Sequence, residues 1–137
     1  MTQSRILVVE DNERNLKLVR DVLEFAGFQV VGARSGEQGI VLARERPPDL
    51  VLMDLQLPDM DGATTLRVLR GDPLTRDVPV VAVTAFAMQE DRERALRAGF
   101  NGYLAKPISV RALPAQVRAF MHREELEDER GPDRPGR

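Results

Sequence analysis

The sequence predicts an α/β fold in which one parallel β-sheet is covered by helices on both faces, and three observations support this. Five short apolar runs alternate with five segments of helical spacing along the 137 residues, which is the pattern of repeated βαβ units. The runs are continuously apolar, as is typical of strands buried on both faces. Gly and Pro residues separate many of the segments. We therefore expect an open sheet with right-handed crossovers.

Most of the expected strands are short runs rich in Val, Leu and Ile, and they are bounded by charged or turn-forming residues. In chain order these runs are 5–10, 28–31, 49–54, 78–84 and 102–105. Because all of them are followed by a helix-like segment, consecutive strands are expected to run parallel.

The first expected helix has apolar residues at helical spacing, and the expected helices are marked by start or stop signals. In chain order the helices are expected at 13–26, 35–46, 61–70, 88–98 and 109–121. Asn12, Ser35 and Asp61 are the expected N-terminal caps, and Gly27 and Gly99 are the expected stops.

The start of the last expected helix is irregular in the sequence. Pro114 stands late for a first helical turn counted from a cap at Ser109. The helix therefore either begins after Ser109 or has an irregular first turn.

Residues 1–123 are expected to form one folded domain, and 124–137 a tail. Hydrophobic residues make up 42% of the chain, which is typical of a globular protein. From residue 124 the composition becomes charged and then rich in Pro and Gly. Such a segment buries too little apolar surface to offset the entropy of ordering, so we expect a mobile, disordered tail.

Composition excludes several classes of function. The chain has no cysteine, which excludes disulfides and thiolate metal sites. The formal net charge of -2 offers no basic surface for nucleic acid. There is no apolar run long enough to cross a bilayer and no apolar signal region at the N-terminus, so we expect a soluble cytoplasmic protein without membrane contact.

Polar side chains follow four of the expected strands at the point where each ends. Glu10 and Asp11 follow the first, Asp54 the third, Thr84 the fourth and Lys106 the fifth. Carboxyl ends of parallel strands meet at one edge of a sheet, so these groups are expected to cluster. Clustered carboxylates favour a hard cation, magnesium above all, and a nearby ammonium and hydroxyl suit a phosphoryl group. One such residue alone is more often a helix cap, but the whole set favours a site.

With these residues in place, the sequence resembles the response regulator receiver domains over about residues 4–122. The motifs that carry the resemblance are Glu10-Asp11, Asp54, the loop Leu57-Pro58 to Asp61-Gly62, Thr84-Ala85 and Lys106-Pro107. The resemblance implies a flavodoxin-like (βα)5 fold, a doubly wound parallel five-stranded sheet with strand order 2-1-3-4-5.

The resemblance also implies a role for each motif. Asp54 is expected to accept a phosphoryl group from the phosphohistidine of a sensor histidine kinase or a phosphotransfer protein. Asp54, Glu10, Asp11 and the backbone carbonyl of Gln56 are expected to hold Mg²⁺, for which Mn²⁺ is a possible substitute. The expected contacts of the phosphoryl group are Thr84, Ala85 and Lys106.

Signalling is expected to follow from the same resemblance. Thr84 and Tyr103 are the expected switch residues, and Lys106–Pro107 is expected to be a cis peptide bond. The downstream partner is expected to be a protein, bound on the face formed by the fourth helix, fifth strand and fifth helix. With no appended effector domain, the chain reads as a single-domain signalling protein that assists its own phosphorylation and dephosphorylation rather than as an enzyme.

Two other functions fit the fold less well. A constitutive adaptor that ignores phosphate does not need the full set of site residues. A magnesium-dependent phosphatase with an aspartyl nucleophile usually has a second Asp two residues later, where this chain has Gln56.

Glu10 stands where Asp is common in the family. Asp59 and Asp61 are expected to be loop and cap residues rather than metal ligands.

Overall fold

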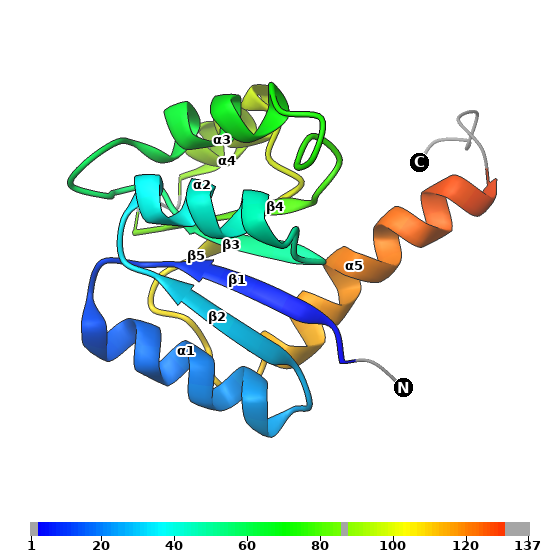
Figure 1. Ribbon diagram of the computed structural model, residues 1–137. Coiled ribbons are helices and arrows are strands. Elements are labelled where there is room, and N and C mark those ends of the chain that lie inside the picture. Colours follow the sequence, from blue (N-terminus) through cyan, green and yellow to red (C-terminus); the bar gives the residue numbers. More distant parts are fainter. Residues whose placement is uncertain (1–2, 86–87, 131–137) are drawn as a thin grey trace.

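The structure is a computed structural model that describes residues 3–85 and 88–130. Within those ranges the chain forms one parallel sheet of five strands in the order β2-β1-β3-β4-β5 (Figure 1). The strands are β1 (Arg5–Val9), β2 (Gln29–Ala33), β3 (Leu50–Asp54), β4 (Val80–Thr84) and β5 (Gly102–Ala105). This strand order confirms the expected flavodoxin-like topology.

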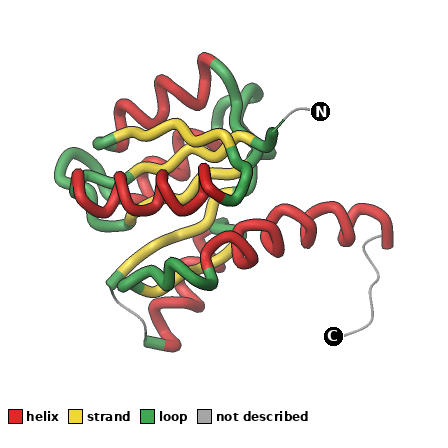
Figure 2. The backbone as a smooth tube through the Cα atoms, turned by 90° about the horizontal axis from the view of Figure 1, so that it is seen from below, coloured by secondary structure: helices red, strands yellow, loops and turns green. Residues whose placement is uncertain are grey.

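Helices cover both faces of the sheet, as Figures 1 and 2 show. The helices are α1 (Glu13–Phe25), α2 (Gly36–Glu45), α3 (Gly62–Arg70), α4 (Gln89–Ala98) and α5 (Leu113–Arg130). Helices α1 and α5 pack on one face, and α2, α3 and α4 pack on the other. Across the described ranges, none of these helices has the length and apolar character needed to span a membrane.

Two apolar cores flank the sheet because the side chains of each strand alternate between its faces. In β1, Ile6 and Val8 pack against α1 and α5, whereas Leu7 and Val9 pack against the other three helices. Strands β3 and β4 are buried at every residue, which explains their continuously apolar sequence. Each fully buried aliphatic side chain contributes roughly 1.5–3 kcal/mol to folding.

The expected helix signals are confirmed. The side-chain oxygens of Asn12, Ser35 and Asp61 each accept a hydrogen bond from the backbone N–H three residues later, at 3.0, 3.1 and 2.7 Å. Such a cap is worth about 1 kcal/mol. Gly27 and Gly99 follow α1 and α4 with φ of 102° and 112°, a left-handed conformation that glycine adopts without strain.

Four strands differ in their bounds from the prediction, and two of them, β2 and β4, differ by two residues at one end. β2 extends to Ala33. Gly32 and Ala33 carry little strand signal in the sequence, but they pair with Val8 and Val9 of β1. β4 begins at Val80 rather than at residue 78, because Pro79 has no N–H to donate to a neighbouring strand. The N–H of Val80 instead donates to the side-chain oxygen of Asn101 at 2.8 Å.

Helix α5 begins after Ser109, which confirms one of the two alternatives that Pro114 left open, and it ends later than expected. It begins at Leu113, so Pro114 falls in the first turn, where a missing N–H breaks no helical bond. Before it, Ser109 closes a turn by accepting from the N–H of Ala112 at 3.2 Å. The helix continues to Arg130, so 124–130 of the expected disordered tail is helical. This stretch is rich in Glu, which favours helices, and extending a formed helix needs no new nucleation. Residues 131–137 lie outside the described residues.

Candidate functional site

Two neighbouring strands end at the same edge of the sheet and bring three carboxylates together. Val9 of β1 pairs with Met53 of β3, so Glu10 and Asp54 come next in line at that edge. One carboxylate oxygen from each of Glu10, Asp11 and Asp54 lies within 4.8 Å of the others. Glu10 is 6% and Asp54 only 2% exposed, and Asp11 is half-buried. Three negative charges this close repel one another and favour a bound cation.

The loop after β1 holds its two acidic residues in place through backbone contacts. The N–H of Glu10 donates to the carbonyl of Ala33 at 2.9 Å, which continues the pairing with β2. The carboxylate of Glu10 accepts from the N–H of Asn12 at 3.1 Å. The guanidinium of Arg34 donates to the carbonyl of Asp11 at 3.1 Å. The carboxylates therefore sit on a loop that is fixed from both sides.

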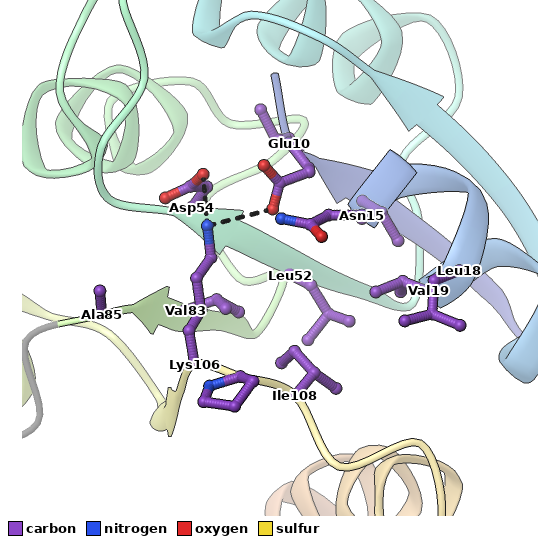
Figure 3. Close-up of a pocket in the computed structure, with 13 residues that line it drawn as sticks. Glu10, Asn15, Leu18, Val19, Leu52, Asp54, Val83, Ala85, Lys106 and Ile108 are labelled. Carbon is purple, nitrogen blue, oxygen red and sulfur yellow. Dashed lines mark hydrogen bonds and ion pairs between the residues drawn. The ribbon is translucent and has the colours of Figure 1, made fainter. Parts of the chain in front are cut away.

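Lys106 supplies the positive charge of the cluster. Its ammonium lies 3.0 Å from Oδ2 of Asp54 and 3.3 Å from Oε1 of Glu10 (Figure 3). Its backbone N–H donates to the carbonyl of Thr84 at 2.8 Å, and the Lys106–Pro107 peptide bond is cis, as the resemblance implied. One ammonium against three carboxylates leaves the cluster with net negative charge.

The second oxygen of Asp54 faces the loop that follows β3. Oδ1 accepts from the N–H of Gln56 at 2.9 Å. The side-chain oxygen of Gln56 in turn accepts from the N–H of Ala85 at 3.3 Å. Thr84 ends β4 beside this loop and is buried. Gln56 is therefore joined to both Asp54 and Ala85, and Thr84 precedes Ala85 in the chain. The metal and phosphoryl contacts expected of these three residues stay a prediction.

Burial and charge shift the pKa values of two groups in the cluster. Burial raises the pKa of Glu10, and the charge of Asp54 adds to that rise against the hydrogen bond from Asn12 and the charge of Lys106. Burial by itself lowers the pKa of Lys106, but the hydrogen bond and charge of Asp54, with those of Glu10, outweigh burial and raise it. The ammonium is therefore charged at neutral pH, but one positive charge does not balance three carboxylates.

A second set of side chains surrounds Tyr103 on β5. Tyr103 and Thr84 line a cavity of about 250 Å³ between the loop after β3 and helix α4. The Tyr103 hydroxyl is buried and finds no hydrogen-bond partner among the residues that the structure describes. Burial, followed by the charge of Asp91, raises its pKa. Tyr103 is thus placed beside Thr84 and not within the carboxylate cluster.

An apolar cavity of about 370 Å³ adjoins the carboxylate cluster and was not anticipated from the sequence. Figure 3 shows Leu18 and Val19 of α1 on one side, Ile108 on the other, and Asp54 and Lys106 at one end. The sequence held one hint of this surface, because Leu18 is an apolar residue off the buried stripe of α1. In the structure its side chain is 46% exposed. Its partner across the cavity depends on the path of the chain after β5, which no local pattern reports.

Asp59 and Asp61 act on backbone groups, as expected. The carboxylate of Asp59 accepts from the N–H groups of Gly36 and Glu37 at 3.0 and 3.1 Å, at the start of α2. The hydrogen bond from Gly36 lowers the pKa of Asp59. Asp61 caps α3, and the hydrogen bond from the Thr64 N–H lowers its pKa. Both carboxylates are held outside the acidic cluster.

The start of α3 approaches the loop after β3 closely. A Cβ added at Gly62 would lie 2.4 Å from Cδ2 and 3.0 Å from Cα of Leu55, the residue after Asp54. Glycine is therefore required by space and not by conformation. The contact holds the loop after β3 against the helix and with it the backbone of Gln56.

Known proteins are similar to this chain in sequence and in fold. The family model for the response regulator receiver domain matches residues 6–118. The polar-differentiation response regulator DivK of Brucella ovis is 45% identical over 121 residues, which cover 88% of this chain and 98% of that protein. The family model therefore covers all the residues of the acidic cluster and all of the sheet except Arg5.

Solved structures of receiver domains have the same fold as this chain. A CheY-like response regulator receiver domain protein from Methanospirillum hungatei has a TM-score of 0.82 and 29% identity, covering 91% of this chain and 98% of its own. The receiver domain of a sensor histidine kinase from Pseudomonas aeruginosa has a TM-score of 0.80 and 36% identity, covering 88% and 99%. That receiver domain was solved with a magnesium ion coordinated in its active site cleft.

Proposed function

This chain belongs to the response regulator receiver domain family, and from that premise we propose that it is a signalling protein switched by phosphorylation of Asp54. One observation carries the assignment to this residue. Asp54 is a buried carboxylate that accepts from an ammonium on one oxygen and from a backbone N–H on the other, beside two further carboxylates. Asp59 and Asp61, the acidic residues that follow in the loop, are occupied with helix N-termini.

In the proposed reaction a carboxylate oxygen of Asp54 attacks the phosphorus of a donor phosphohistidine. The phosphorus–nitrogen bond breaks, and the leaving imidazole keeps its electron pair and takes up a proton. Lys106 balances charge on the phosphoryl oxygens, since its ammonium already lies 3.0 Å from Oδ2. The Thr84 hydroxyl and the Ala85 N–H serve as further donors. The Ala85 N–H now makes a long 3.3 Å bond to Gln56, which a phosphoryl oxygen replaces at little cost.

The donor set fits a magnesium ion. Glu10, Asp11, Asp54 and the backbone carbonyl of Gln56 offer oxygen only, which is the preference of hard divalent cations, and Mn²⁺ is a workable substitute. When bound, the ion adds positive charge beside the attacking and transferred oxygens. The chain's own contribution is to hold these oxygens on two fixed loops and to bury the nucleophile.

The phosphoryl donor is proposed to be a sensor histidine kinase or a phosphotransfer protein that docks over α1. The apolar cavity beside the cluster supports this docking position. Its exposed rim, with Leu18 and Pro107, lies next to Asp54 and offers apolar surface to an incoming helix. A donor seated there brings its phosphohistidine to the open side of the acidic cluster.

The output is proposed to be protein binding on the face of α4, β5 and α5. Thr84 ends β4 and Tyr103 lies on β5, and both line one cavity against α4. A phosphoryl group that accepts a hydrogen bond from the Thr84 hydroxyl is therefore expected to change the structure of that face first. Typical coupling of about 1–3 kcal/mol changes partner affinity roughly 5- to 150-fold.

The direct test is phosphotransfer to the Asp54→Asn variant. Purified protein, magnesium and a radiolabelled histidine kinase are expected to label the wild-type chain and not the variant, and EDTA is expected to abolish labelling. Asp77→Asn is the matched control, because Asp77 is an exposed carboxylate in the loop before β4, at the opposite edge of the sheet from the acidic cluster. That variant is expected to be labelled like the wild type.

Two results separate this function from its alternatives. Undiminished labelling of Asp54→Asn would falsify the assignment of the phosphoacceptor. A wild-type chain that takes no label from any kinase, yet binds its partner equally with and without beryllofluoride, is a constitutive adaptor.

A further inference from the structure

The loop 55–61, which joins β3 to α3, is also bonded to α2. In the proposed function this loop supplies the backbone carbonyl of Gln56 to the metal ion. Asp59, three residues later, accepts from the N–H groups of Gly36 and Glu37 at 3.0 and 3.1 Å, one with each carboxylate oxygen. The loop is therefore joined to the start of a helix that precedes β3 in the chain.

The contact between this loop and α2 is close as well as polar. A Cβ added at Gly36 would lie 2.7 Å from Cγ of Met60 in the loop and 2.7 Å from Oγ1 of Thr65 on α3. The first residue of α2 therefore packs directly on the loop and on α3, and the two helices lie side by side on one face of the sheet (Figure 1). A shift of the loop at Asp59 and Met60 consequently breaks contacts with α2.

Helix α2 has a second cap, which is made within its own segment. Ser35, directly before the helix, accepts from the N–H of Gln38 at 3.1 Å. The first N–H groups of a helix lack partners inside the helix, and Ser35 and Asp59 satisfy different members of this set. The bond to Ser35 fixes the start of the helix, whereas the bonds to Asp59 join the helix to the loop. The stability of the helix and the placement of the loop can therefore be tested separately.

We propose that Asp59 is a positioning residue for the magnesium site: it holds the loop against α2 and thereby keeps the Gln56 carbonyl in place beside Asp54. This proposal rests on the proposed function, because it requires that the acidic cluster binds the ion. The other end of the segment is set by Asp54, whose Oδ1 accepts from the N–H of Gln56 at 2.9 Å. Mg²⁺ requires near-ideal octahedral geometry, so a small displacement of one ligand weakens binding. Asp59 acts through the backbone of the loop, since its own oxygens are occupied by the start of α2.

The test is a magnesium titration of the full chain, followed through the amide NMR signals of Asp11 and Gln56. Asp59→Ala is expected to raise the Kd for Mg²⁺ about fivefold. This loss is smaller than the roughly 10- to 100-fold typical of residues that bond a metal ligand directly, because Asp59 acts through the loop backbone. At saturating magnesium the variant is expected to accept the phosphoryl group to the same extent as the wild type, because Asp54 is intact.

Three variants separate the placement of the loop from capping and from charge. Ser35→Ala removes a cap from the same helix start, and is expected to lower the urea midpoint about as much as Asp59→Ala while leaving the Kd unchanged. Glu37→Gln removes an exposed negative charge from the same turn but keeps the N–H that bonds Asp59, and is also expected to leave the Kd unchanged. Asp59→Asn keeps one side-chain oxygen that accepts from α2, so it is expected to bind Mg²⁺ only about twofold more weakly than the wild type.

The outcomes separate this proposal from the proposed function. If Asp59→Ala loses stability like Ser35→Ala but binds Mg²⁺ like the wild type, Asp59 is only a helix cap, and phosphoryl transfer to Asp54 still stands. A Kd raised equally in Ser35→Ala or in Glu37→Gln assigns the effect to the helix start or to charge, and also overturns the positioning role. A wild-type chain that binds no Mg²⁺ overturns the proposed metal site and this proposal together.

Discussion

Helices α1 and α4 lie on opposite faces of the same sheet, and the sheet holds them very differently (Figure 1). Helix α1 buries three apolar residues, among them the fully buried Leu23, and begins with a side-chain cap from Asn12. Helix α4 buries only Ala95 of its ten residues, and Met88 at its start offers no side-chain cap. Helix α1 is therefore held on the sheet by more buried apolar contacts than helix α4.

This difference matches the two tasks proposed for the molecule. Helix α1 follows the loop that carries Glu10 and Asp11, where metal binding needs fixed oxygens. Helix α4 follows the loop after Thr84, where a phosphoryl group has to shift an equilibrium between two arrangements. Elements that move in such switches come from the less stable part of a fold, since the coupling energy is only a few kcal/mol.

The largest contrast is expected from the same substitution in the two helices. Leu23→Ala empties a site that is 0% exposed, and is expected to lower the free energy of unfolding by about 2–5 kcal/mol. Leu96→Ala changes a side chain on α4 that is 43% exposed, and is expected to cost less than about 1 kcal/mol. Urea denaturation of both variants measures the difference. Equal losses in the two variants contradict the view that α4 is weakly held.

Hydrogen exchange tests the same contrast without mutation. Amides in the centre of α4 are expected to exchange through local opening, whereas those of α1 near Leu23 exchange only on global unfolding. We expect α4 amides to be protected about 100-fold less, which corresponds to roughly 2.7 kcal/mol. Beryllofluoride is expected to narrow this gap. Similar protection in both helices before it is added argues against α4 as the mobile element.

The sequence predicted the parts of the site that topology dictates. Parallel strands must end at a common edge, so Asp11, Asp54 and Lys106 were expected to meet, and they do. The caps at Asn12 and Asp61 depend on short-range hydrogen bonds and were equally readable. These features need no knowledge of how side chains pack between distant elements.

The features that were missed depend on such packing. The cavity beside Leu18 exists only because the chain after Lys106 brings Ile108 across from α1. The burial of the Tyr103 hydroxyl, which has no hydrogen-bond partner within 3–85 and 88–130, depends on packing that no spacing pattern encodes. The start of α5 was predicted only as one of two alternatives, because the local signals for the Ser109 turn and for the helix overlap.

Caps offer a smaller, reciprocal test of the comparison. Asn12→Ala removes the hydrogen bond to the N–H of Asn15 and is expected to cost about 1 kcal/mol of stability. Met88→Ser gives α4 the cap that it lacks, and is expected to add roughly 0.5 kcal/mol, since Met88 is 67% exposed and little packing is lost. Denaturation reports both values, and exchange of α4 amides is expected to slow in Met88→Ser alone. A Met88→Ser variant with unchanged α4 exchange shows that the missing cap is not what loosens this helix.

The smallest expected effect is the titration of Tyr103, which reports on the contact between β5 and α4. Tyr103 is the single tyrosine in a chain without tryptophan, so absorbance near 295 nm follows its ionisation alone. Burial, then the charge of Asp91 on α4, raises its pKa, so the midpoint is expected above the ordinary value of about 10. Because the folded state holds the proton more tightly than the unfolded state, this group's contribution to stability is complete below that ordinary value. The contribution is then lost as pH rises through the folded-state pKa. Asp91→Asn is expected to lower the midpoint slightly, while Asp21→Asn on α1 leaves it unchanged. A midpoint at or below 10 in the wild type means that solvent reaches the phenol and that α4 does not cover it.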